Sequence, residues 1–194
     1  EFSEMELDLH VLVLNAGAMF AKKEITSDGF DAMMVTNHFG HFLLTMLLLP
    51  NMLATEKKGG MPRIVQVSSC ITFEPTRFDF SEAIKVTSES EREAWLAEKG
   101  ESYRMFHAYD QSKLANMLCI MELSSRLNSI GSNIPVNALH PGEIFTEIFR
   151  DFHPCIVWLT EMFSFCIYAF LKSSRQGSIG TVYACTAPGM ATAE

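Results

Sequence analysis

The sequence predicts an α/β fold in which helices flank a parallel β-sheet. Short, uninterrupted apolar runs, typical of strands buried on both faces, alternate along the chain with longer stretches of helical periodicity. Each apolar run ends in small or polar residues, as strands do where a sheet meets its loops. The resulting order, strand, helix, strand, helix, strand, predicts βαβ units joined by right-handed crossovers.

The expected strands are His10–Leu14, Arg63–Ser69 and Pro135–Leu139. All three are rich in valine, leucine or isoleucine, and turn-forming residues follow each of them. We expect these strands to be buried on both faces, as in a parallel sheet covered by helices.

Two long helices are expected between the strands. The first covers Phe30–Leu49, begins after the capping residues of Thr26-Ser-Asp-Gly, and is expected to stop at Pro50 because proline lacks the backbone N–H. The second covers Met105–Leu127. Between them, residues 76–105 are the most polar part of the chain and predict a solvated insertion with a short helix near Trp95.

Length and charge narrow the class of protein. A chain of 194 residues fits one domain, and its 48% hydrophobic and 20% charged residues exclude a disordered chain. A net charge of −8 leaves no basic surplus for neutralising phosphates, so we expect no nucleic-acid partner. The cysteines are five scattered residues without a Cys-x-x-Cys pair, which indicates reduced thiols and an intracellular location, in the cytoplasm or on a membrane.

Residues 154–171 are almost entirely apolar or aromatic. Glu161 lies in the middle of this segment, and a membrane-spanning helix tolerates a central charge poorly. We therefore expect the segment to line a hydrophobic substrate pocket or to lie against a membrane surface.

Tyr109 and Lys113 stand four residues apart, which places a phenol and an ammonium on one face of a helix. A tyrosine with its usual pKa of about 10 is a poor base at neutral pH. An ammonium about 5 Å away would favour the phenolate by roughly 3 kcal/mol, or about two pKa units. Such a phenol can exchange a proton with an alcohol.

Five motifs occur in a fixed order along the chain. They are Asn-Ala-Gly at 15–17, Asn-His-x-Gly-His-Phe at 37–42, Val-Ser-Ser at 67–69, Tyr-x-x-Ser-Lys-x-Ala-Asn at 109–116 and His-Pro-Gly-x-x-x-Thr at 140–146. Together they resemble the motifs of the short-chain dehydrogenase/reductase family, and their residues are most similar to those of its retinol dehydrogenase branch. Residues 9–15 and 176–183 are also similar to WW-domain oxidoreductases. The resemblance covers roughly residues 9–188.

The resemblance implies a role for each motif. Tyr109 would be the acid/base, Lys113 would lower its pKa and hold the nicotinamide ribose, Ser69 would bond the substrate oxygen, and Asn37 would bind a water in a proton relay. The residues implied to contact the cofactor, NAD or NADP, are Asn15, Ala16, Gly17, Lys113, Pro141, Gly142, Ile144 and Thr146. The implied reaction is reversible hydride transfer between the nicotinamide and a hydrophobic alcohol or carbonyl compound, such as a retinoid, steroid or lipid aldehyde.

His38 and His41 are three residues apart on the first expected helix, but no third ligand is placed to join them, so we expect no metal site.

The family's glycine-rich turn, Thr-Gly-x-x-x-Gly-x-Gly, has no match in this sequence. The resemblance therefore implies a partial Rossmann-like, doubly wound parallel sheet over residues 1–194, a single N-terminally truncated domain without the family's first three strands and its last strand. We expect the isolated chain to have little activity. The second hypothesis, from another class, is a non-catalytic interaction protein that keeps the fold but lacks the pyrophosphate site.

Overall fold

The structure is a computed structural model that describes residues 5, 7–20, 22–69, 78, 86–100, 105–142, 144 and 171–188. Its sheet has three parallel strands in the order β1 (Val11–Leu14), β2 (Arg63–Val67) and β3 (Val136–Leu139). The register pairs Leu12 with Ile64, and Ile64 with Val136. The predicted α/β class and the parallel sheet are confirmed.

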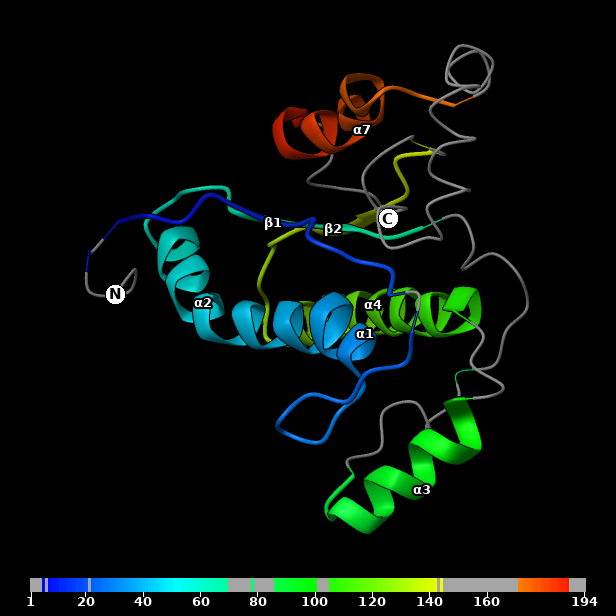
Figure 1. The fold of residues 1–194 in the computed structure, drawn as a ribbon. Coiled ribbons are helices and arrows are strands. Elements are labelled where there is room, and N and C mark those ends of the chain that lie inside the picture. The colour runs from blue at the N-terminus through cyan, green and yellow to red at the C-terminus, as the bar shows by residue number, and fades with distance from the viewer. Residues whose placement is uncertain are drawn as a thin grey trace.

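Helices lie on both faces of this sheet (Figure 1). On one face are α1 (Ala32–Met34), the π-helix η2 (Val35–Phe39), α2 (Gly40–Lys57) and α4 (Met105–Ser129). On the other face, α7 (Ser174–Thr186) packs against β2 and β3. The buried core between the sheet and the first group of helices consists of Leu12, Leu14, Met52, Ile64, Ile120, Leu123, Leu127 and Ile134.

The prediction that the first long helix ends at Pro50 is wrong, because α2 continues through Pro50 to Lys57. Pro50 is exposed, whereas Met52 and Thr55, just beyond it, are fully buried. The Thr55 hydroxyl also accepts a hydrogen bond from the backbone N–H of Leu9, at 3.0 Å. Burial of this last part of the helix offsets the backbone hydrogen bond that proline cannot make.

The start of the helix also differs from expectation. Its capping residue is Asp31, whose Oδ1 accepts a hydrogen bond from the Met34 backbone N–H at 2.9 Å. Thr26 instead closes a separate turn, in which its carbonyl accepts from the Gly29 N–H at 2.9 Å. The sequence Thr26-Ser-Asp-Gly therefore forms a turn that precedes the helix, and the helix itself is capped by Asp31.

Burial on both faces is correct for β2 and wrong for β1. All five residues of β2 are buried, whereas Val11 and Val13 of β1 are 37% and 40% exposed. Among the described helices, α7 covers β2 and β3, so the outer face of β1 stays open.

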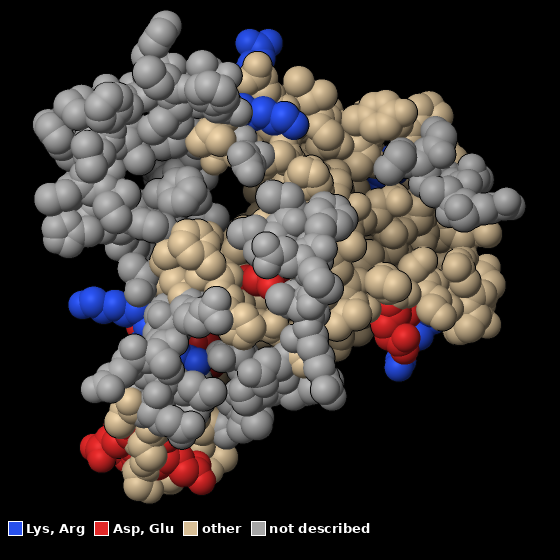
Figure 2. Space-filling model, turned by 90° about the vertical axis from the view of Figure 1, so that its right-hand side faces the viewer, with Lys and Arg blue, Asp and Glu red and all other residues tan. Residues whose placement is uncertain are grey.

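The polar insertion contains α3 (Glu89–Gly100), where a short helix was expected. In Figure 1, α3 stands apart from the sheet, and Figure 2 shows acidic atoms at the same end of the molecule. Glu89, Glu91 and Glu93 are the exposed glutamates of this helix. The apolar segment 154–171 lies outside the described residues, except for Leu171.

One helical run in the described part of the chain, Ala32–Lys57, is long and apolar enough to cross a membrane by length and composition. The core helix of a soluble protein and a signal sequence meet the same criterion, and 28% of this apolar stretch is buried inside the structure.

One contact joins α7 to the sheet, and another joins it to the loop after β3. Arg63, at the start of β2, donates through Nη1 to the carbonyls of Ala184 (3.3 Å) and Ala187 (2.9 Å) at the helix C-terminus. Near the other end, Gly177 is buried against Ile144, whose side chain occupies the space that a Cβ would need. The loop after β3 is therefore held against α7.

We predict opposite effects of alanine at the two glycines of α7. Gly177→Ala should lower the free energy of unfolding by about 1 to 3 kcal/mol, because the new methyl group overlaps Ile144. Gly180 has no atom within 4 Å of its Cβ position, so Gly180→Ala should raise it by up to about 1 kcal/mol through helix propensity. Urea unfolding of both variants measures this, and effects of the same sign would contradict the contact.

Candidate active site

The candidate site lies where the three parallel strands end. Residues 15–17 follow β1, Ser68 and Ser69 follow β2, and residues 140–142 follow β3. Since the strands are parallel, these ends share one edge of the sheet, the edge at which open α/β folds bind ligands. The β-carbon position of Gly17 is 3.3 Å from Lys113 Nζ, so the first of these segments lies directly on α4.

Tyr109 and Lys113 are both buried, with 8% and 3% of their surface exposed. The amine Nζ lies 5.6 Å from the centroid of the Tyr109 ring and donates a hydrogen bond to the Val67 carbonyl at 3.1 Å. Tyr109 packs in a small cluster with Met19, Met33 and Ala108. The spacing predicted from the sequence therefore brings the phenol and the ammonium together inside the protein.

Burial lowers the pKa of Lys113 from 10.5 to about 8. The cause is desolvation, because the charged form loses contact with water. At neutral pH the amine remains mostly protonated, and it can stabilise negative charge on a neighbouring phenol. Perturbed pKa values of this kind cluster at functional sites, so the shift makes Lys113 a candidate site residue.

Asn37 is fully buried in η2 and bonds the segment that follows β1. Its Oδ1 accepts from the Ala18 N–H at 2.8 Å, and its Nδ2 donates to the Ala18 carbonyl at 2.9 Å and to Ser112 Oγ at 3.0 Å. The Ser112 hydroxyl in turn donates to the Tyr109 carbonyl at 2.7 Å. Asn37 thus joins the β1 end to the helix that carries Tyr109.

The two serines after β2 occupy different environments. Ser68 is buried, and its hydroxyl lies 3.4 Å from the Lys113 carbonyl, to which it donates. Ser69 is only partly buried, so its side chain is the more accessible of the two. The assignment of substrate binding to Ser69 stays a prediction.

The residues expected to contact the cofactor are accessible at the same edge. Asn15, Ala16 and Gly17 are exposed, and Pro141, Gly142 and Ile144 are partly buried. Gly142 has a φ of +88°, a conformation that L-residues rarely adopt. Thr146 lies outside the described residues. The β-carbon position of Gly142 lies 2.7 Å from Lys172 Nζ, so the Lys172 side chain packs against this glycine. Cofactor contact by these residues stays a prediction.

Neither histidine of the first long helix joins a metal cluster in the described part of the chain. His38 Nδ1 lies 2.9 Å from Asn116 Oδ1, and His41 Nδ1 lies 3.3 Å from Gln66 Nε2. Burial lowers the pKa of both imidazoles, and for His41 the charge of Lys113 adds to the effect. Both side chains therefore serve as neutral hydrogen-bonding groups.

Two buried side chains of the site were not identified as functional from the sequence. Asn116 donates through Nδ2 to the Asn37 carbonyl at 2.9 Å, and Gln66 donates through Nε2 to the Leu14 carbonyl at 3.0 Å. The one available signal was for Asn116, which follows Tyr109 by seven residues and so lies on the same helix face.

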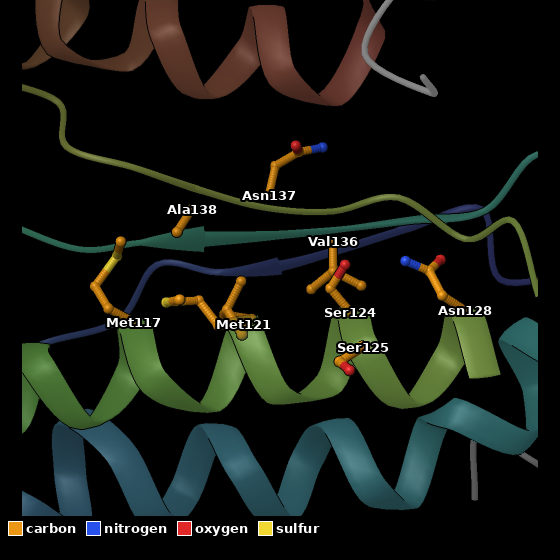
Figure 3. A pocket seen from close by; sticks show the side chains of 9 residues that line it. Met117, Met121, Ser124, Ser125, Asn128, Val136, Asn137 and Ala138 are labelled. Atoms are coloured by element: carbon orange, nitrogen blue, oxygen red, sulfur yellow. The ribbon is translucent and has the colours of Figure 1, made fainter. Parts of the chain in front are cut away.

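A separate hollow of about 560 Å³ lies between α4 and β3 (Figure 3). Its lining residues are Met117, Ile120, Met121, Ser124, Ser125, Asn128, Val136, Asn137 and Ala138. Figure 3 shows Asn137 pointing away from α4 while Val136 points toward it. None of the predicted site residues lines this hollow, so it is distinct from the candidate site.

Known proteins are similar in sequence to this chain. The family profile described as short chain dehydrogenase matches residues 3–79. The chain is 34% identical over 191 residues to the short-chain dehydrogenase TIC 32 A of Brassica napus, covering 98% of this chain and 55% of that protein. Over nearly its whole length the chain is similar to members of the short-chain dehydrogenase/reductase family. Its retinol dehydrogenase-like character is supported by human retinol dehydrogenase 14, which is 35% identical over 97% of this chain and 49% of its own length.

Solved structures of short-chain dehydrogenases and reductases share the fold. A 3-ketoacyl-(acyl-carrier-protein) reductase from Brucella melitensis, solved with NADH, has a TM-score of 0.62 at 18% identity, covering 96% of this chain and 63% of that one. A protein from Mycobacterium paratuberculosis has a TM-score of 0.55 at 34% identity, and the match covers 77% of this chain and 48% of that one. The present chain spans about half the length of the curated relatives it matches.

We predict that Lys113→Met raises the free energy of unfolding at pH 7 by about 1 to 2 kcal/mol. A fall in pKa from 10.5 to about 8 corresponds to roughly 3 kcal/mol of desolvation, from which the lost hydrogen bond to Val67 subtracts about 1 kcal/mol. Between pH 8 and 10.5 the unfolded wild-type chain binds a proton that the folded chain lacks, so the advantage of the variant should shrink as pH rises.

Urea unfolding at several pH values between 7 and 10 measures this dependence. Lys57→Met, at an exposed position of α2, is the matched control, and its difference from wild type in the free energy of unfolding should not shrink as pH rises. A difference between Lys113→Met and wild type that stays constant with pH would contradict the burial of a charged amine.

Proposed function

We propose that this chain carries the catalytic part of an NAD(P)-dependent oxidoreductase. The reaction would be reversible hydride transfer between a nicotinamide cofactor and a hydrophobic alcohol or carbonyl compound. The observation that carries the proposal is the pair of buried side chains, Tyr109 and Lys113, on one turn of α4 at the strand ends. Similarity to the short-chain dehydrogenase/reductase family supports it.

When bound, the nicotinamide supplies or accepts the hydride, and the side chains handle the proton. Tyr109 donates a proton to the carbonyl oxygen in reduction and takes one from the alcohol in oxidation. Lys113, 5.6 Å from the ring centroid, stabilises the phenolate by its charge. Ser69 bonds the substrate oxygen, and Asn37 holds the β1 end in place beside Lys113.

Two groups of residues would hold the cofactor. Residues 15–17 would border its adenosine half, while Pro141, Gly142, Ile144 and Thr146 would hold the nicotinamide. The Brucella melitensis reductase of the same fold was solved with NADH, which supports a nicotinamide cofactor for this chain.

A hydrophobic substrate is proposed from two observations. The apolar segment 154–171 follows the loop after β3 and would cover the pocket or contact a membrane surface. Relatives at 34% to 35% identity include retinol dehydrogenase 14 and the polyprenol dehydrogenase of Mus musculus, whose names specify long apolar alcohols. Hydride-transfer assays of the complete protein with retinal, steroid ketones and short aldehydes test this, and a preference for a short polar substrate would contradict it.

Tyr109→Phe in the complete protein should lower kcat/KM by about 10²- to 10⁴-fold, because the ring packing remains and the proton donor is lost. Tyr183→Phe, on the exposed face of α7, is the matched control and should retain activity. Cofactor oxidation followed at 340 nm provides the rate. Full activity in Tyr109→Phe would refute the proposed role.

The 194-residue chain by itself should bind NADH and NADPH weaker than micromolar, because it contains no glycine-rich pyrophosphate turn. Isothermal titration calorimetry of this chain with each cofactor measures the affinity. Micromolar binding would overturn this expectation and would also identify the preferred cofactor.

A further inference from the structure

The backbone carbonyl of Asn37 is held by a side chain from another helix. Asn116 of α4 is 1% exposed, and its Nδ2 donates to the Asn37 carbonyl at 2.9 Å. The bond spans 79 positions in the sequence and meets η2 within its five-residue π-helical stretch. Such stretches widen a helix locally and are frequent at functional sites.

The orientation of the Asn116 amide follows from this bond. Because Nδ2 donates to the Asn37 carbonyl, Oδ1 is the acceptor, and its partner is His38 Nδ1 at 2.9 Å. His38 Nδ1 therefore carries the hydrogen. His38 and Asn37 are adjacent in the chain, so a single asparagine side chain bonds two consecutive residues of η2.

The next contacts lead from Asn37 to the lysine amine. The Asn37 side chain makes two hydrogen bonds to the Ala18 backbone, of 2.8 and 2.9 Å. The neighbouring residue is Gly17, whose β-carbon position is 3.3 Å from Lys113 Nζ and 3.4 Å from Asn37 Oδ1. Displacement of Asn37 would therefore displace the wall against which the amine is packed.

We propose that Asn116, braced by His38, is a positioning residue that sets the Asn37 amide and, through Ala18 and Gly17, the place of the Lys113 amine. Its effect on turnover rests on the proposed function, whereas the arrangement itself does not. These two side-chain bonds of Asn116 lead to neither Tyr109 nor Lys113, so it acts through Asn37.

The test is Asn116→Asp in the complete protein, which keeps the side-chain shape and replaces the donor by an oxygen. A carboxylate facing the Asn37 carbonyl repels it, and the same carboxylate beside His38 Nδ1 raises the pKa of His38. Loss of one hydrogen bond should speed amide exchange at Ala18, the donor to Asn37 Oδ1, by about tenfold. Hydrogen exchange and an NMR titration of His38 measure both effects without an activity assay.

Turnover provides a further readout, with kcat expected to fall about tenfold and KM to stay within about twofold, because a misplaced amine affects the chemical step rather than binding. Asn128→Asp, at an exposed position of the same helix, is the matched control and should change none of these quantities.

His38→Phe is the second variant, for use if Asn116→Asp fails to fold. Phenylalanine keeps a ring beside Phe39 and Phe42, with which His38 has centroid distances of 5.6 and 6.4 Å, and removes only the donor to Asn116. Faster exchange at Ala18 in either variant supports the proposal, and unchanged exchange in every variant that folds overturns it. If the wild-type protein shows no turnover, the proposed function is refuted. The hydrogen-exchange measurement at Ala18 would still test the positioning role of Asn116.

Discussion

The arrangement of the site depends on keeping the Lys113 amine charged while it is buried. Desolvation works against the charged form, and the structure places two groups that favour it close to the amine, the Val67 carbonyl and the face of the Tyr109 ring. Lys113 reaches the end of β2 at Val67, and Tyr109 lies one turn away from it on α4. The glycine at position 17 follows from the same constraint, since a side chain there would contend with the amine for space.

Buried amide side chains connect the strand ends to the helices around this amine. Gln66 of β2 donates through one nitrogen to the Leu14 carbonyl at 3.0 Å and lies 3.2 Å from the Val67 carbonyl, which is also the acceptor for Lys113. Asn37 accepts a hydrogen bond from the Ala18 N–H after β1, and Asn116 of α4 donates to the Asn37 carbonyl. These two amides therefore connect the end of β1 to α4. Amides suit this position because each offers both a donor and an acceptor and carries no charge that would disturb the lysine. The outcome is a site whose parts come from segments far apart in sequence but share hydrogen-bond partners.

The described sheet is covered unevenly. Helices α2 and α4 cover one face, while on the other face α7 covers β2 and β3 and leaves Val11 and Val13 exposed. Half of β1 therefore offers apolar surface beside the strand end that carries residues 15–17. The exposed face of β1 thus lies next to residues 15–17.

The sequence by itself determined the α/β class, the three strands and the pairing of Tyr109 with Lys113, because periodicity and a four-residue spacing are local properties of the chain. The motif resemblance added Asn37 and the strand-end loops. Only the tertiary structure decided that the helix passes through Pro50, that Asp31 rather than Thr26 caps it, and that Asn116 holds the Asn37 carbonyl. These features arise from contacts between distant residues: burial of Met52 and Thr55 outweighs a missing N–H, and the role of an asparagine depends on which backbone it meets after folding.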